Sequence, residues 1–160
     1  MDLKIVPAFN YKEEIKILFK EYTDMLVNND PVFSKYLEQQ NYDKEIDNLE
    51  EKYAPPMGRL YIAFSNQEVV GCIALKQMNS DSGELKRLYV REKFRKAGIG
   101  SILVDKIISD AKEIGYTYLK LDTLPFLKEA IHIYEAKGFE HIEKYNDSPM
   151  ESGIYMQYKL

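Results

Sequence analysis

A pair of glycines at the start of an amphipathic helix constrains this chain more than any other feature. Gly98 and Gly100 precede a run whose apolar residues recur every three or four positions up to a capping glycine, Gly115. The residues before the pair form a predicted strand, 83–90, and a basic loop, 91–97. Free N–H groups and the dipole at such a helix start attract anions, and glycine lets a ligand approach closely. The segment therefore predicts a binding site for a phosphate-bearing ligand.

Two other phosphate-binding loops agree less well with this sequence. A Walker loop requires Gly-x4-Gly-Lys-Ser/Thr, and the chain has no such string. A dinucleotide-binding fingerprint is closer, because Asp122 follows the glycines at about the expected separation. Its third glycine position holds Leu103, however, and the basic loop lengthens a turn that should be tight. A dinucleotide-binding module is therefore the weaker alternative.

Composition limits the class of protein. The chain has 160 residues, 45% hydrophobic and 30% charged, as is typical of one soluble globular domain. Its net charge of −4 argues against a nucleic-acid partner. The single cysteine, Cys72, lies in an apolar run, and there is no metal-binding Cys/His spacing, so we expect a reducing compartment and no metal. No signal peptide or membrane-spanning run is visible, which predicts a cytoplasmic protein without a membrane partner.

Hydrophobic periodicity predicts a mixed sheet with helices on both faces. The segment 31–40 is ambiguous between a helical turn and a loop. Pro125 is expected in the first turn of the last helix. The expected order is strand, two helices, three strands, helix, strand, helix and two strands. The strands are expected at 3–6, 60–65, 69–75, 83–90, 116–121, 139–144 and 153–160, and the helices at 11–29, 43–52, 99–114 and 126–137.

The strand 83–90 is expected to contain a bulge. Leu85 and Leu88 differ in parity, whereas Leu88 and Val90 agree. One extra residue between the first two would place all three leucine and valine side chains on one face of the sheet.

Two motifs resemble the GCN5-related N-acetyltransferase (GNAT) superfamily. Residues 95–100, Arg-Lys-Ala-Gly-Ile-Gly, match the family's pyrophosphate loop, Arg/Gln-x-x-Gly-x-Gly/Ala. Residues 130–139 match its signature Ala-x3-Tyr-x3-Gly-Phe, and residues 66–73 are similar to its second-to-third-strand hairpin. The motifs occur in the family's order over essentially the whole chain. One position departs from the family's pattern, because many members carry asparagine where this chain has Leu127.

The resemblance implies one α/β (α+β) N-acetyltransferase domain over residues 1–160, with a mixed, mostly antiparallel sheet of about seven strands. It implies acetyl-coenzyme A (acetyl-CoA) as the donor and a primary amine, on a small molecule, as the acceptor that attacks directly. A homodimer is left open. A non-catalytic sensor that binds acyl-CoA is the alternative in another functional class, and the presence of Tyr134 argues against it.

The resemblance also implies roles for single residues. Tyr134 would protonate the leaving thiolate, for which a phenol suffices because a thiol of pKa ~8.5 is a fair leaving group. Glu84 would deprotonate the amine through water, with Asp122 and Tyr145 as further candidates. Cofactor contacts are implied for Leu88, Tyr89, Val90, Arg95, Lys96, Ala97, Gly98, Ile99, Gly100, Ser101, Thr123, Ala130, Tyr134 and Lys137.

The acceptor is expected between the more variable parts of the family layout. These are the N-terminal helices, the turn 53–58 and the segment 145–152. His132 and His141 are expected at the surface, because neither shares a face with the predicted site residues.

Overall fold

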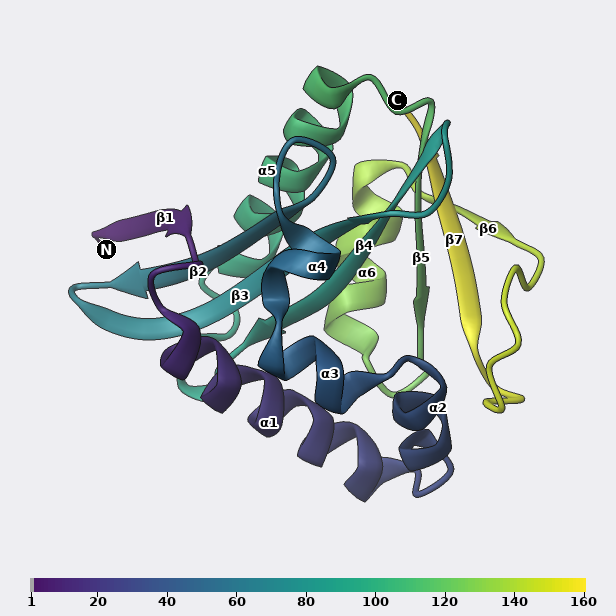
Figure 1. Ribbon diagram of the computed structural model, residues 1–160, viewed down its shortest axis with the longest axis horizontal. Helices are drawn as coiled ribbons and strands as arrows, with labels where there is room; N and C mark the ends of the chain where they lie inside the picture. Colours follow the sequence, from purple (N-terminus) through teal and green to yellow (C-terminus); the bar gives the residue numbers. More distant parts are fainter. Residues whose placement is uncertain (1) are drawn as a thin grey trace.

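The computed structural model describes residues 2–160, which form a seven-stranded sheet in the order β1-β2-β3-β4-β5-β7-β6 (Figure 1). All neighbouring strands are antiparallel except β4 and β5, which are parallel. This confirms the mixed, mostly antiparallel sheet. The strands are β1 (Leu3–Pro7), β2 (Arg59–Ser65), β3 (Glu68–Gln77), β4 (Ser82–Val90), β5 (Tyr118–Thr123), β6 (Glu140–Ile142) and β7 (Ile154–Lys159).

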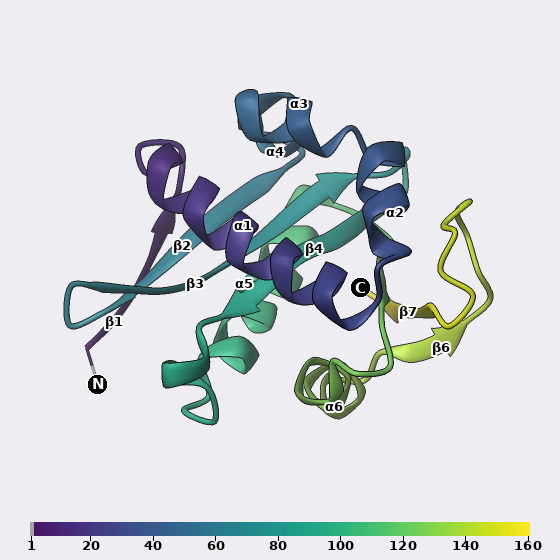
Figure 2. The same cartoon turned by 90° about the horizontal axis from the view of Figure 1, so that it is seen from below.

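Helices cover both faces of the sheet. Their bounds are α1 (Lys12–Asn29), α2 (Phe33–Gln39), α3 (Tyr42–Asp47), α4 (Leu49–Tyr53), α5 (Ile99–Ile114) and α6 (Lys128–Lys137), with a short 3₁₀ turn at Glu92–Phe94. Helices α1 to α4 lie on one face, and α5 and α6 on the other (Figure 2). Strand β3 lies between the two layers and is buried on both sides, which explains its continuous apolar run.

Strands β4 and β5 are paired at one end only. Their ladder contains the pairs Ser82–Tyr118, Gly83–Leu119 and Glu84–Lys120. Beyond Glu84, β4 continues to Val90 without a strand partner on that side. The two strands diverge from this point (Figure 1). The edge of β4 that faces β5 therefore has backbone groups available for something other than a strand.

The predicted bulge lies in β4, at Arg87, whose φ is +59°. The register pairs Cys72 with Tyr89 and Ala74 with Lys86, so two steps along β3 correspond to three along β4. The bulge keeps three apolar side chains in the core beneath α5 and α6, as the sequence predicted: Leu85, Leu88 and Val90.

Three predicted elements differ from the structure. The helix expected over 43–52 is divided into α3 and α4 by Asn48, whose φ of −141° and ψ of 80° are not helical. Helix α6 begins at Lys128, and Pro125 instead lies in a turn closed by a hydrogen bond from the Leu127 N–H to the Leu124 carbonyl (3.0 Å). The strand expected over 139–144 is limited to β6. The ambiguous segment 31–40 forms α2.

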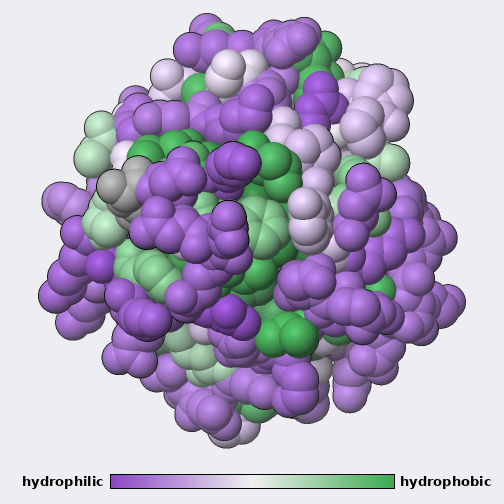
Figure 3. All heavy atoms as spheres, turned by 90° about the vertical axis from the view of Figure 1, so that its left-hand side faces the viewer, coloured by the Kyte–Doolittle hydropathy of each residue, from purple (hydrophilic) through white to green (hydrophobic). Residues whose placement is uncertain are grey.

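Strand β1 is one edge of the sheet. The face of the molecule on this side carries hydrophobic side chains near its centre, among mainly hydrophilic ones (Figure 3). None of the helices within residues 2–160 combines the length and the apolar character needed to span a bilayer.

Candidate active site

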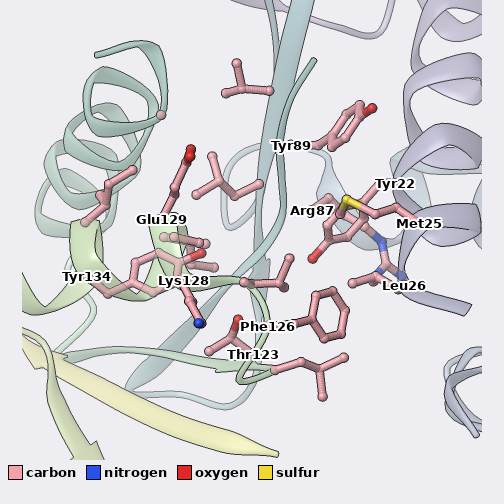
Figure 4. A pocket seen from close by; sticks show the side chains of 18 of the residues that line it. Tyr22, Met25, Leu26, Arg87, Tyr89, Thr123, Phe126, Lys128, Glu129 and Tyr134 are labelled. Carbon is pink, nitrogen blue, oxygen red and sulfur yellow. The ribbon is translucent and has the colours of Figure 1, made fainter. Parts of the chain in front are cut away.

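A cavity of about 710 Å³ opens where β4 and β5 diverge. Helix α6 contributes Tyr134 to one side of it, and α1 contributes Tyr22 and Met25 to the opposite side (Figure 4). The start of α5, helix α2 and the segment before β7 complete the walls. The cavity therefore joins the predicted anion site to the predicted acceptor region.

The glycine pair of the predicted anion site lies on the cavity wall. Gly98 precedes α5 with a φ of +84°, a conformation that side chains disfavour. A Cβ added at Gly100 would lie 3.0 Å from Cδ1 of Ile133, so the small residue allows α6 to pack close to the start of α5. The Arg95 Nε–H donates to the Val90 carbonyl (2.8 Å), which holds the guanidinium beside this helix start.

The basic residues of 86–96 do not form one patch. Arg87 is buried on the opposite side of β4 from the glycines. Arg91 pairs with Glu21 (2.8 Å), and Lys93 lies 3.5 Å from Glu68. Two basic residues of the loop line the cavity near the glycines, Arg95 and Lys96. The anion site is therefore smaller than the sequence indicated.

Most of the predicted cofactor contacts line this one cavity. Two do not: Ala97 is exposed beside it, and the Lys137 ammonium lies 2.8 Å from a carboxylate oxygen of Asp105 on α5. The residues that the structure brings together are Leu88, Tyr89, Val90, Arg95, Lys96, Gly98, Ile99, Gly100, Ser101, Thr123, Ala130 and Tyr134.

Tyr134 lies at the meeting point of α6 and the cavity. Its ring packs against Phe139, with 5.6 Å between the ring centroids, and only 4% of the residue is exposed. Burial raises the pKa of its phenol, and the nearby Asp122 adds to the effect. No side chain among residues 2–160 hydrogen-bonds to the hydroxyl. Tyr134 is therefore a protonated phenol whose donor is not used by the fold.

The candidate bases occupy different places. Glu84 is buried beside the cavity rather than on its wall, where its Oε2 accepts a hydrogen bond from the Tyr145 hydroxyl (2.6 Å). Asp122 lines the cavity and accepts hydrogen bonds at Oδ2 from the Tyr36 hydroxyl and from the Asn146 side chain (3.2 Å). Of the sequence-derived carboxylates, Asp122 is the one that faces the cavity.

The two histidines are exposed, as expected. His132 lies at the rim of the cavity, and His141 lies 3.0 Å from Glu135.

A buried ion pair forms the polar floor next to the cavity. The Arg87 guanidinium donates to both carboxylate oxygens of Glu45 (2.8 and 2.9 Å), and the Lys52 ammonium lies 2.8 Å from the same carboxylate. Burial alone would raise the pKa of Glu45, but the two cations outweigh it and lower that pKa to about 2. Both partners are therefore charged, and each depends on the other to be tolerated inside the protein.

Lys86 also lines the cavity, and its ammonium has much weaker partners than the Arg87 guanidinium has. Its ammonium lies 3.3 Å from the Gln40 side-chain oxygen and 3.8 Å from Oε1 of Glu84, and its side chain is 8% exposed. Burial, together with the adjacent Arg87, lowers the pKa of Lys86 to about 8.

The remaining wall was predicted by region only. The N-terminal helices and the segment before β7 do line the cavity, but the turn 53–58 does not, and its Met57 carbonyl accepts a hydrogen bond from the Tyr116 hydroxyl (2.7 Å). Helix periodicity predicted which residues of α1 form its apolar stripe, but not which of them lie in the core and which line the cavity. The wall residues that the sequence did not single out include Tyr22, Met25, Leu26, Phe33, Tyr36, Ser148 and Met150.

Comparison with known proteins agrees with this geometry. Residues 18–139 match the family model described as the acetyltransferase (GNAT) family. The chain is 30% identical to an uncharacterized N-acetyltransferase of Dictyostelium discoideum, in an alignment that covers all of both chains.

Solved structures share the fold of this chain. A GNAT-family acetyltransferase of Staphylococcus aureus superposes with a TM-score of 0.74 over 99% of each chain, at 23% identity. A GNAT-family acetyltransferase of Elizabethkingia anophelis with acetyl-CoA bound is 27% identical, with a TM-score of 0.56 over 65% of this chain and 77% of that one. From its family match, its relatives and its fold, this chain is a member of the GNAT family of acetyltransferases.

Proposed function

We propose that this protein transfers the acetyl group of acetyl-CoA to a primary amine on a small molecule by direct attack of the amine on the thioester. The observation that carries the proposal is that the glycine start of α5 and the Tyr134 hydroxyl open on the same cavity. The Elizabethkingia relative, which has acetyl-CoA bound, supports the choice of donor. A sensor would not need the acid, and a dinucleotide-binding module is not favoured by the family match.

The donor would bind along the divergence of β4 and β5. Its pyrophosphate would lie at the start of α5, where Arg95, Lys96 and the free N–H groups attract phosphate. Its pantetheine arm would follow the unpaired edge of β4. A backbone N–H in 88–90 would then polarise the thioester carbonyl.

The chemistry needs two proton movements. The neutral amine forms a bond to the carbonyl carbon, and the carbon–sulfur bond then breaks to release the thiolate. Tyr134 gives its proton to the sulfur, and the amine gives one up. We assign that second proton to Asp122 ahead of Glu84, because Asp122 faces the cavity. Glu84 would act only through Tyr145 or water.

Release of free thiol from acetyl-CoA tests this function. We expect thiol release that depends on added amine, with a rise in melting temperature on adding acetyl-CoA but not NAD. Stabilisation by acetyl-CoA without release of thiol for any amine would favour the non-catalytic acyl-CoA sensor. Stabilisation by NAD alone would favour the dinucleotide-binding module.

Gly98 provides a test of the donor site. Aspartate and asparagine both tolerate a positive φ, and a side chain at this position meets no other atom within 4 Å. We expect Gly98→Asp to bind coenzyme A at least about tenfold more weakly than Gly98→Asn, because only the aspartate repels the pyrophosphate. Isothermal titration calorimetry measures the difference. Equal affinities for the two variants would place the pyrophosphate elsewhere.

A further inference from the structure

We propose that the acceptor is a free amino acid that binds as a zwitterion, with its carboxylate at Lys86 and its amino group at Asp122. The inference rests on the proposed acetyl transfer and narrows its acceptor. The two side chains carry opposite charges on the wall of the same cavity, and each has hydrogen-bonding capacity that the protein does not use.

Lys86 provides the unused donors. Its ammonium has three N–H groups, while its partners are the Gln40 oxygen at 3.3 Å and, more distantly, Glu84 at 3.8 Å. The neighbouring Arg87 is satisfied by Glu45 and so does not compete for a ligand. A cation that is more than nine-tenths buried and poorly paired is unfavourable unless an anion joins it. A ligand carboxylate at this position would supply the missing partner.

Asp122 provides the unused acceptor. Both of its hydrogen bonds, from Tyr36 and Asn146, reach Oδ2. Within the described part of the chain, Oδ1 accepts no side-chain hydrogen bond. These two donors fix the orientation of the carboxylate and leave its second oxygen for a ligand ammonium. The same carboxylate is the group to which we assign the amine's proton.

Lys86 and Asp122 lie on the same face of the sheet, on neighbouring strands. Glu84 of β4 pairs in register with Lys120 of β5, and this is where the ladder ends. Two residues further along each strand are Lys86 and Asp122, and side chains two apart share a face. Both side chains therefore point toward α2 and away from α5. Lys86 lies on β4 and Asp122 on β5, one on each side of the gap where these strands diverge.

The charge balance favours a zwitterion over a simple amine or a polyamine. Three cations and three carboxylates face this region from β4, β5, α3 and α4: Lys52, Lys86 and Arg87 against Glu45, Glu84 and Asp122. A ligand without net charge preserves this balance, whereas a polyamine adds buried positive charge beside Lys86. A peptide N-terminus has its amide, not a carboxylate, next to the amine, and would leave Lys86 unpaired.

The rest of this wall indicates an apolar side chain on the amino acid. Four buried apolar residues from α1, α2 and the segments before α6 and β7 line it: Leu26, Phe33, Leu124 and Met150. Leucine and phenylalanine are therefore the first acceptors to test.

Comparing L-leucine, L-leucinamide and 3-methylbutylamine as acceptors isolates the contribution of the carboxylate to kcat/KM. We expect the wild-type kcat/KM to be at least about tenfold higher for leucine than for leucinamide. This preference opposes intrinsic reactivity, because removing the carboxylate charge lowers the pKa of the amine and leaves more of it neutral. The phenylalanine set provides the same comparison. Equal or better use of the amide or the simple amine would overturn the inference.

Variants of Lys86 test whether this side chain causes the preference for leucine over leucinamide. We expect Lys86→Met to lower kcat/KM for leucine about ten- to hundredfold, with leucinamide changed less than about threefold. Lys86→Arg should keep most of the preference. The control is Lys76→Met, on the same face of the adjacent strand β3 and outside the cavity, which should behave as wild type. A uniform loss for all acceptors in Lys86→Met, or loss of the preference in Lys76→Met, would contradict the assignment.

The failure of this inference differs from failure of the proposed function. If none of the twenty amino acids supports thiol release, the inference is wrong, even where other amines do support it. If acetyl-CoA neither binds in calorimetry nor releases thiol with any amine, the proposed function itself is wrong.

Discussion

Replacing Tyr134 by phenylalanine is expected to lower kcat by roughly 10²–10⁴-fold, the range for loss of a general acid. The substitution keeps the ring and its packing on Phe139. The hydroxyl has no side-chain partner in the described chain, so the melting temperature should hardly change. Steady-state kinetics at saturating acetyl-CoA, with a parallel denaturation curve, measures both quantities.

Tyr116 offers the matched control. It lies in the same hydrophobic cluster, is equally buried, and donates its hydroxyl proton to the Met57 carbonyl (2.7 Å), away from the cavity. Tyr116→Phe should lower the free energy of unfolding by about 0.5–1.5 kcal/mol and leave kcat unchanged. If Tyr134→Phe behaves in the same way, Tyr134 is a core residue and the acid lies elsewhere.

Replacing Glu45 by glutamine is expected to lower the free energy of unfolding by about 3–5 kcal/mol, because it leaves Arg87 buried without its counter-ion. The pKa of Glu45 is lowered from 4.5 to about 2 by folding, so the unfolded chain binds its proton first as the pH falls. The ion pair's contribution is therefore complete above about pH 4.5 and is lost between there and about pH 2. Urea denaturation at pH 7 and pH 3 should show the difference between wild type and variant shrinking.

Glu50 is the control for this prediction. It pairs with Lys12 at the surface, and exposed pairs contribute little. Glu50→Gln should change stability by less than about 1 kcal/mol. Equal effects of the two substitutions would mean that the buried pair does not stabilise the fold.

The features that sequence predicted correctly are those encoded locally. The periodicity and end glycines of α5 are contained in one run, and the parity of Leu85, Leu88 and Val90 agrees with the bulge. The placement of Gly98, Gly100 and Tyr134 on one cavity followed from motifs of a few residues each.

The polar half of the cavity was not predictable in this way. It depends on contacts between distant residues: Arg87 of strand β4 binds Glu45 of helix α3, and Tyr36 reaches Asp122 across 86 residues of sequence. Neither pairing produces a periodic pattern. Residue type alone does not show which side of a strand a charged side chain occupies, so the burial of Arg87 could not be predicted from the sequence. The break at Asn48 is likewise set by how α3 and α4 pack on the sheet.

The bulge in β4 also has a consequence for how this protein can change. It gives the strand two consecutive polar residues on the α2 side, Lys86 and Arg87, where a regular strand would offer one. Both side chains line the cavity, but the arginine is paired with Glu45, whereas the lysine has only weak partners. A substitution of Lys86 that changes which acceptor binds would therefore leave the ion pair between Arg87 and Glu45 intact. Under the proposed binding of the acceptor, two adjacent positions of β4 would therefore have separate effects, one on the stability of the fold and one on the choice of acceptor.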